Sequence, residues 1–235
     1  MDEAPQFIVD LPWIYHLNSN NLVNVMFFLK KYSEAEALIS QQRQFMPAYG
    51  IKRPQLEKLV FLNTHESELY LHYCLQHFPK AANVSRAIES EVKKIETKFS
   101  PVLYDLIFMM AVAELMVKNY KAASRWLNKI LHSGQDINLR MEIQINTRLL
   151  YLIVLHESGD RLFENRFNST KRFLSQQSQF KTQQKILEAI RLVYEEAAES
   201  KITKLITIIR KEQKQSAELV LNKQFDFASW IENKF

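Results

Sequence analysis

Apolar residues recur along this chain at intervals of three and four positions, the spacing that places side chains on one face of an α-helix. The pattern is clearest between residues 121 and 132, where the apolar positions are Ala123, Trp126, Leu127, Ile130 and Leu131. No stretch of strand length alternates apolar and polar residues with a period of two. The pattern therefore predicts an all-α protein.

Prolines, glycines and polar clusters interrupt this spacing and divide the chain into about nine or ten helices. The clearest start is at Ser100 and Pro101, because serine caps helix N-termini and proline fits the first helical turn. Residues 102–118 are apolar nearly all round, which predicts a central, buried helix. The predicted helices cover residues 22–31, 34–45, 55–78, 84–99, 102–118, 121–132, 137–157, 160–175, 186–197 and 202–209.

Pro47, Gly50 and Pro54 lie close together and mark a break in the helical pattern. We therefore predict a lead-in and a short helix pair over residues 1–50. Residues 51–235 are predicted to form the main helical domain, continuous with this first part.

The two ends of the chain differ in character. Residues 1–20 contain Pro12 and a run of asparagines, which predicts an irregular segment with Asn20 or Asn21 as the cap of the first helix. Residues 225–235 are rich in aromatic side chains, so we expect them to dock on the body of the protein as a cap.

The composition excludes several classes of site. Only three glycines occur in 235 residues, whereas phosphate-binding loops and nucleophile elbows need glycine at fixed positions. Gly134 and Gly159 follow long helical segments, where we expect them to end helices. Cys74 is the only cysteine, which is typical of a reducing, cytoplasmic compartment. The most apolar stretch, residues 106–113, is too short to cross a membrane, so no membrane partner is expected.

The net charge of +5 arises entirely in the second part of the chain. Residues 1–100 hold 11 acidic and 11 basic side chains, whereas residues 101–235 hold 15 acidic and 20 basic ones. Nucleic-acid binding through this basic part is therefore one alternative function. A basic cluster in this part comprises Lys201, Lys204, Arg210, Lys211 and Lys214.

Few residues suggest catalysis or metal binding. His65, His72, Cys74 and His77 form a cluster in the sequence, but at about 100° per residue His72 and Cys74 point in different directions. We therefore predict no metal site, no cofactor and no catalytic residue. The second alternative is an enzyme or carrier with an apolar pocket between helices.

One segment follows the order of a tetratricopeptide repeat. Ala111 and Ala123 stand where that repeat has small residues between two antiparallel helices, and Tyr120 stands at the turn. The segment resembles that family, and residues 145–174 resemble a second, degenerate copy with Gly159 at its turn. The resemblance implies an antiparallel array of helix hairpins wound into a superhelix, and no particular activity.

The end of the chain is also similar to a family of uncharacterised bacterial helical-repeat proteins. The matching segments are residues 120–127, 148–160 and 172–174, followed by the aromatic ending at residues 225–231. This resemblance covers residues 100–235 and suggests the C-terminal part of a longer solenoid.

Four apolar residues occupy positions where peptide-gripping repeats offer Lys and Asn to a carboxylate. They are Phe108, Val112, Leu149 and Ile153. A carboxylate clamp is therefore not expected, and we expect other helices of the chain to cover this apolar strip.

The polar face of the helix predicted over residues 160–175 is the best candidate for a functional surface. Its opposite, buried face is expected to carry Phe163, Phe167, Thr170 and Leu174. The exposed arginines present planar forks that suit carboxylates or phosphates. The candidate interaction residues are Arg161, Asn165, Asn168, Lys171 and Arg172. We expect a non-catalytic scaffold that holds a protein partner or another part of its own longer chain.

Overall fold

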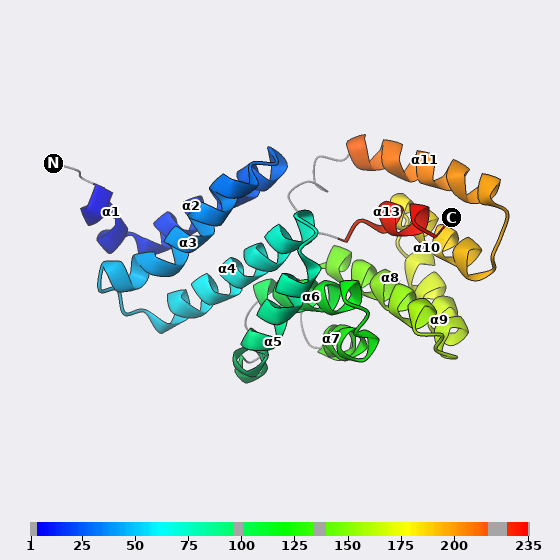
Figure 1. Cartoon of the computed structure of the whole chain (residues 1–235), viewed down its shortest axis with the longest axis horizontal. Helices are drawn as coiled ribbons and strands as arrows, with labels where there is room; N and C mark the ends of the chain where they lie inside the picture. The colour runs from blue at the N-terminus through cyan, green and yellow to red at the C-terminus, as the bar shows by residue number, and fades with distance from the viewer. Residues whose placement is uncertain (1–3, 96–100, 134–139, 216–224, 235) are drawn as a thin grey trace. The chain divides into compact units, whose positions relative to one another are not determined.

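The computed structural model describes residues 4–95, 101–133, 140–215 and 225–234 (Figure 1). Within these residues the chain forms twelve helices and no strand, so the predicted all-α fold is confirmed. Within each unit most helices that follow one another in sequence pack side by side, as in an array of helix hairpins. The count exceeds nine or ten because the lead-in is helical and the C-terminal cap contains a short helix.

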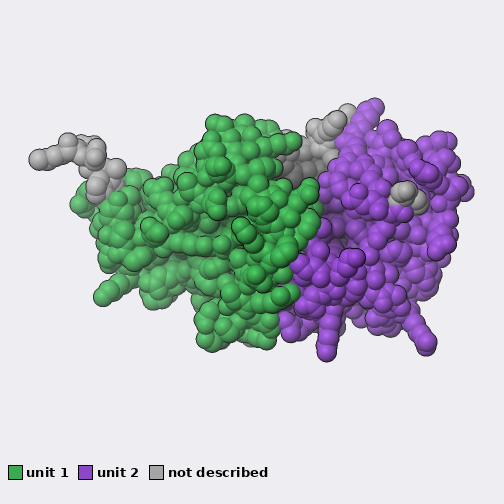
Figure 2. All heavy atoms as spheres, viewed as in Figure 1, with its two compact units in different colours: residues 1–113 green, residues 114–235 purple. Residues whose placement is uncertain are grey.

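The helices divide into two compact units, residues 1–113 and residues 114–235 (Figure 2). Helices α3 (Tyr32–Ala48) and α4 (Pro54–Cys74) lie on the two sides of the predicted break at residue 50 and pack together within the first unit. The predicted division at that break stays a prediction.

The first unit begins with two helices where an irregular segment was expected. Its helices are α1 (Ala4–Asp10), α2 (Pro12–Phe28), α3, α4, α5 (Phe78–Lys94) and most of α6 (Pro101–Met116). The expectation for residues 1–20 is wrong because Pro12 stands in the first turn of α2, where its missing N–H is not needed. Asn20 and Asn21, expected to cap a helix, lie inside α2 instead.

Tertiary packing explains why α2 continues through its polar asparagines. Val23 and Phe27 of α2 are buried in one cluster with Ala35 and Ile39 of α3 and Leu71 of α4. Burial of such side chains outweighs the weak helix propensity of a few asparagines.

Helix α6 is buried nearly all round, as predicted. Its side chains from Leu106 to Ala113 are each at most 4% exposed. The helix begins at Pro101, and the predicted cap, Ser100, lies outside the described residues.

The second unit also consists of consecutive helices. They are α7 (Tyr120–Ser133), α8 (Met141–Glu157), α9 (Phe163–Ser175), α10 (Lys181–Tyr194), α11 (Glu199–Gln215) and α13 (Phe227–Glu232). Gly159 lies just after α8 with φ +65°, in the left-handed conformation that favours glycine after a helix. Gly134 lies outside the described residues.

The aromatic C-terminal segment docks on the second unit, as predicted. Phe227 and Ile231 of α13 are buried, and α13 packs against α10 and α11. Trp230 Nε1 donates a hydrogen bond of 2.7 Å to Glu157 Oε1 at the end of α8. The Trp230 ring also lies 5.8 Å from the ring of His156. These contacts join the last helix to the body of the unit.

The apolar strip expected to be covered is buried in both units. Phe108 and Val112 are buried on α6, and Leu149 and Ile153 are buried on α8. All four residues are therefore covered by other parts of the chain, as expected.

Candidate functional site

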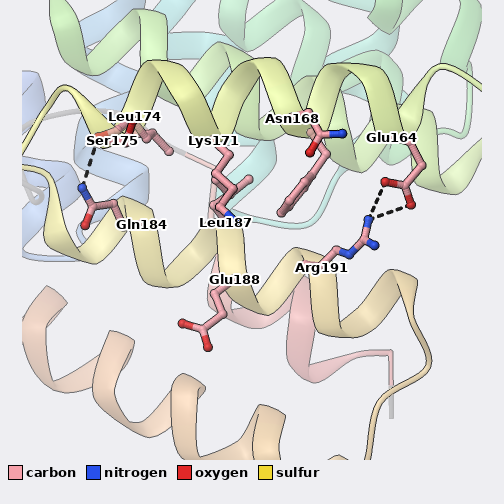
Figure 3. Close-up of a pocket in the computed structure, with 10 residues that line it drawn as sticks. Glu164, Asn168, Lys171, Leu174, Ser175, Gln184, Leu187, Glu188 and Arg191 are labelled. Carbon is pink, nitrogen blue, oxygen red and sulfur yellow. Dashed lines mark hydrogen bonds and ion pairs between the residues drawn. The ribbon is translucent and has the colours of Figure 1, made fainter.

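A groove of about 780 Å³ runs between α9 and α10 in the second unit (Figure 3). Phe167 and Leu174 of α9 and Leu187 of α10 form its floor, and all three are buried. Asn168 and Lys171 stand on the α9 side, and both are exposed. The groove therefore combines an apolar floor with polar side chains that can contact a ligand.

The register of α9 produces this arrangement. Phe163, Phe167, Thr170 and Leu174 are buried on one stripe, as the spacing predicts. The hydroxyl of Thr170 donates to the carbonyl of Arg166 at 2.8 Å, which satisfies the only polar group on that stripe.

Hydrogen bonds hold both ends of the groove. At one end Arg191 Nη1 donates to the two carboxylate oxygens of Glu164 at 2.6 and 2.7 Å. At the other end Gln184 Nε2 donates to the carbonyl of Leu174 at 3.1 Å. Both bonds link α9 to α10, so they fix the two walls of the groove relative to each other (Figure 3).

Arg191 is the most heavily bonded cation at the groove. Besides Glu164, its Nε donates to Glu195 at 2.5 Å, and its guanidinium lies 5.2 Å from the centre of the Phe167 ring. The hydrogen bonds that Arg191 donates to Glu164 raise the pKa of Arg191, so it stays charged. Its role here is to join the helices.

Between these ends the groove carries polar side chains without a partner. Within the described residues Asn168, Lys171 and Glu188 form no hydrogen bond or ion pair. Lys171 comes from α9 and Glu188 from α10 (Figure 3). A ligand in the groove could therefore meet an amide, an ammonium group and a carboxylate.

The structure brings two of the five predicted surface residues to this groove. Asn168 and Lys171 line it, whereas Arg161, Asn165 and Arg172 are exposed elsewhere on or beside α9. A functional role for all five stays a prediction. The α10 side of the groove was missed, since helical spacing within one segment does not show which segment packs opposite it.

The second basic cluster is partly engaged in holding the C-terminal cap. Arg210 donates to Asp226 at 3.0 and 3.1 Å, to Glu232 at 2.9 Å and to the hydroxyl of Ser229 at 2.7 Å. The hydrogen bond with Glu232 is the main cause of its raised pKa. The side chain of Lys214, which belongs to the same cluster, lies outside the described residues.

A smaller groove of about 510 Å³ lies between α3 and α4 in the first unit. Arg43 and His65 stand beside it. Arg43 pairs with Glu68 at 2.5 Å, and His65 Nδ1 donates to the carbonyl of Phe61 at 2.8 Å. Burial lowers the pKa of His65, so this groove presents a neutral imidazole near neutral pH.

His16 and Cys74 of the first unit are both bonded to neighbouring side chains. His16 is buried, and its Nε2 accepts a hydrogen bond of 2.9 Å from Asn63 Nδ2. Burial lowers the pKa of His16 to about 4. The side chain of Cys74 is hydrogen-bonded with the side chains of Tyr70 and Tyr32. Across the described residues no three His, Cys, Asp or Glu side chains converge as metal ligands.

None of the described helices has both the length and the apolar content needed to cross a bilayer. No protein-family model matches this chain, and no curated protein matches it. The resemblance to tetratricopeptide repeats and to the bacterial helical-repeat family therefore stays a prediction.

Proposed function

We propose that this protein is a non-catalytic helical scaffold that holds a protein segment in the α9–α10 groove. One observation carries the proposal. The two ends of the groove are fixed by the hydrogen bonds of Arg191 with Glu164 and of Gln184 with Leu174. Between these ends, three polar side chains have no partner within the described part of the chain, namely those of Asn168, Lys171 and Glu188. A fixed groove with unpaired polar groups binds a ligand without reorganising.

The charges of the groove favour a peptide over an anion. Lys171 and Arg191 are offset by Glu164 and Glu188, so the charged lining residues sum to zero. A phosphate backbone needs an excess of positive charge. A peptide offers carboxylate, ammonium and amide groups together, and it can satisfy Lys171, Glu188 and Asn168 at once.

The same observations give less support to the alternatives. Among the basic side chains of the second unit, Arg191, Arg210 and Lys185 each pair with a carboxylate, which reduces the positive surface open to nucleic acid. An enzyme is also less well supported, because the lining residues of the groove include no histidine or cysteine. The hydroxyl of Ser175, which lines the groove, already donates a hydrogen bond of 2.8 Å to the Arg172 carbonyl. We also propose a reducing, cytoplasmic compartment, supported by the single cysteine.

The test is selection from a random peptide library on the purified chain, followed by affinity measurement on the enriched peptides. We expect Lys171→Glu and Glu188→Lys each to weaken binding by about tenfold or more, because each reverses a charge that faces the ligand. Arg161→Glu is the matched control, since Arg161 is exposed near the start of the same helix but does not line the groove. Failure to enrich any peptide, or equal losses in Lys171→Glu and Arg161→Glu, would overturn the proposal.

A further inference from the structure

Helix α2 of the first unit presents an apolar face to solvent. Pro12, His16, Val23 and Phe27 are buried on its inner side. On the outer side, the apolar residues of α2 and its N-cap residue are 42–58% exposed. These exposed residues are Leu11, Ile14, Leu17, Leu22, Val25 and Phe28, and we refer to them as the outer face of α2.

The outer face of α2 has the spacing of a helix–helix seam. Leu11, Ile14, Asn18, Asn21, Val25 and Phe28 follow one another at intervals of three and four residues. This is the heptad spacing with which two helices pack lengthwise. Asn18 and Asn21 are exposed at the middle of the seam.

The seam is also symmetric about its own centre, between residues 19 and 20. Leu11 and Phe28 are equally far from this centre, and so are Ile14 and Val25. The same holds for Leu17 with Leu22 and for Asn18 with Asn21. Each apolar position therefore has an apolar counterpart across the centre, and each asparagine has an asparagine.

We propose that the protein forms a two-fold dimer in which α2 packs antiparallel against α2 of a second copy. In an isologous interface residue i meets residue j and residue j meets residue i, so a surface must be complementary to itself. Antiparallel pairing about the centre of α2 places apolar residues on apolar residues. It also sets Asn18 against Asn21 of the other copy, where two amides can bond and fix the register.

The charge of this region fits a second copy better than a charged partner. Residues 11–29 contain no Lys, Arg, Asp or Glu. The one histidine among them, His16, is buried and faces inward. Two copies can therefore approach without repulsion between like charges, and a charged peptide finds no complementary group there.

The exposed apolar area also fits a dimer of ordinary size. The six apolar residues of the outer face of α2 are 42–58% exposed. At roughly 150–200 Å² of full surface for each residue, they leave on the order of 500 Å². One partner in an interface of standard size contributes about 800 Å², of which about 65% is apolar in homodimers.

The test is the mass of the full chain in sedimentation equilibrium, which we expect to be twice the 27.8 kDa of one chain. Ile14→Lys and Val25→Glu change two residues of the seam and should each raise the dissociation constant of the dimer by about a hundredfold, because each buries an unpaired charge twice. Mixing these two variants should restore a dimer, since the new lysine and glutamate then face each other while Val25 of one chain faces Ile14 of the other.

Further controls test the specificity of this pairing. Ile208→Lys changes an apolar residue of α11 that is also 42% exposed, and it should leave the dimer intact. A wild-type chain that stays monomeric would overturn the proposal and assign the outer face of α2 to a different protein. Failure of the Ile14→Lys and Val25→Glu mixture to associate would overturn the antiparallel register. The outer face of α2 belongs to the first unit, so the proposed dimer does not depend on the groove of the second unit.

Discussion

Helix α2 of the first unit and helix α11 of the second present opposite kinds of surface to solvent. Both bury apolar residues on one side, such as Val23 on α2 and Ile202 on α11. On its exposed side α11 carries Lys201, Lys204 and other polar residues, with Ile208 as an isolated apolar side chain. The exposed side of α2 carries six apolar residues and two asparagines.

The comparison shows that inward packing does not determine what an outer helix does with its other face. A face with lysines keeps its charges hydrated and needs no partner. Exposing a long apolar face without charge to water costs about 25 cal/mol of free energy per Å². The composition of the outer face therefore distinguishes a helix whose outer side stays in contact with water from a helix whose outer side packs against another chain.

The largest expected effect is on the cap of the second unit. Phe227→Ala should lower the free energy of unfolding by about 3–5 kcal/mol, because Phe227 is only 2% exposed and the substitution leaves a cavity. Chemical denaturation measures the change. Phe28→Ala is the matched control on the outer face of α2, where Phe28 is 58% exposed. At protein concentrations below dimer formation it should change stability by no more than about 0.5 kcal/mol. Equal losses in the two variants would contradict the comparison.

A second expected effect is a loss of stability of the first unit in acid. The unfolded chain protonates His16 near pH 6.5, whereas burial keeps its folded pKa at about 4. The unfolded state therefore binds more protons as the pH falls from 6.5 to 4, and stability should decrease by about 3 kcal/mol over this range. Hydrogen exchange of amides in α2 measures the change within the first unit.

His16→Gln should remove most of this pH dependence. His132→Gln is the control, because His132 is exposed in the second unit. Part of the dependence will persist, since burial also lowers the pKa of His65 in the same unit. A slope between pH 6.5 and 4 that is unchanged by His16→Gln would refute the assignment.

A smaller effect is expected at the ionic contacts of the C-terminal cap. Arg210→Ala removes the hydrogen bonds to Asp226, Ser229 and Glu232 and should lower the stability of the second unit by about 1–2 kcal/mol. Arg210 is about one-third exposed, so salt should screen part of this contribution. Lys211→Ala, at an exposed position of the same helix, should have almost no effect on the melting temperature.

Helical spacing predicted the parts of the fold that depend on one segment at a time. It placed the buried stripe of α9 correctly, from Phe163 to Leu174, and it identified α6 as a buried helix. The turn at Gly159 was also predictable, because a left-handed residue after a helix is usually glycine.

The errors and omissions arose where distant segments decide the outcome. Pro12 suggested an irregular segment, but proline is equally suited to the first turn of a helix, and packing against α3 and α4 selected the helix. The Arg191–Glu164 pair joins residues 27 positions apart, so no local pattern indicates it. The spacing of the apolar residues on the outer face of α2 can be read from the sequence. Their exposure could not be predicted, because it depends on the other side of the helix being buried.

Chemical cross-linking between copies of α2 would detect the proposed dimer and its register together. Asn18→Cys and Asn21→Cys are introduced separately into a Cys74→Ser background, in which serine retains the capacity for hydrogen bonding that Cys74 uses with Tyr70. One of the two chains carries a mass tag, so that the mixed product and the products of like chains differ in mass when the chains are oxidised together. Antiparallel pairing predicts that the mixed product, with residue 18 joined to residue 21, predominates. Products that join only like residues, or no cross-linked product, would contradict the proposed dimer.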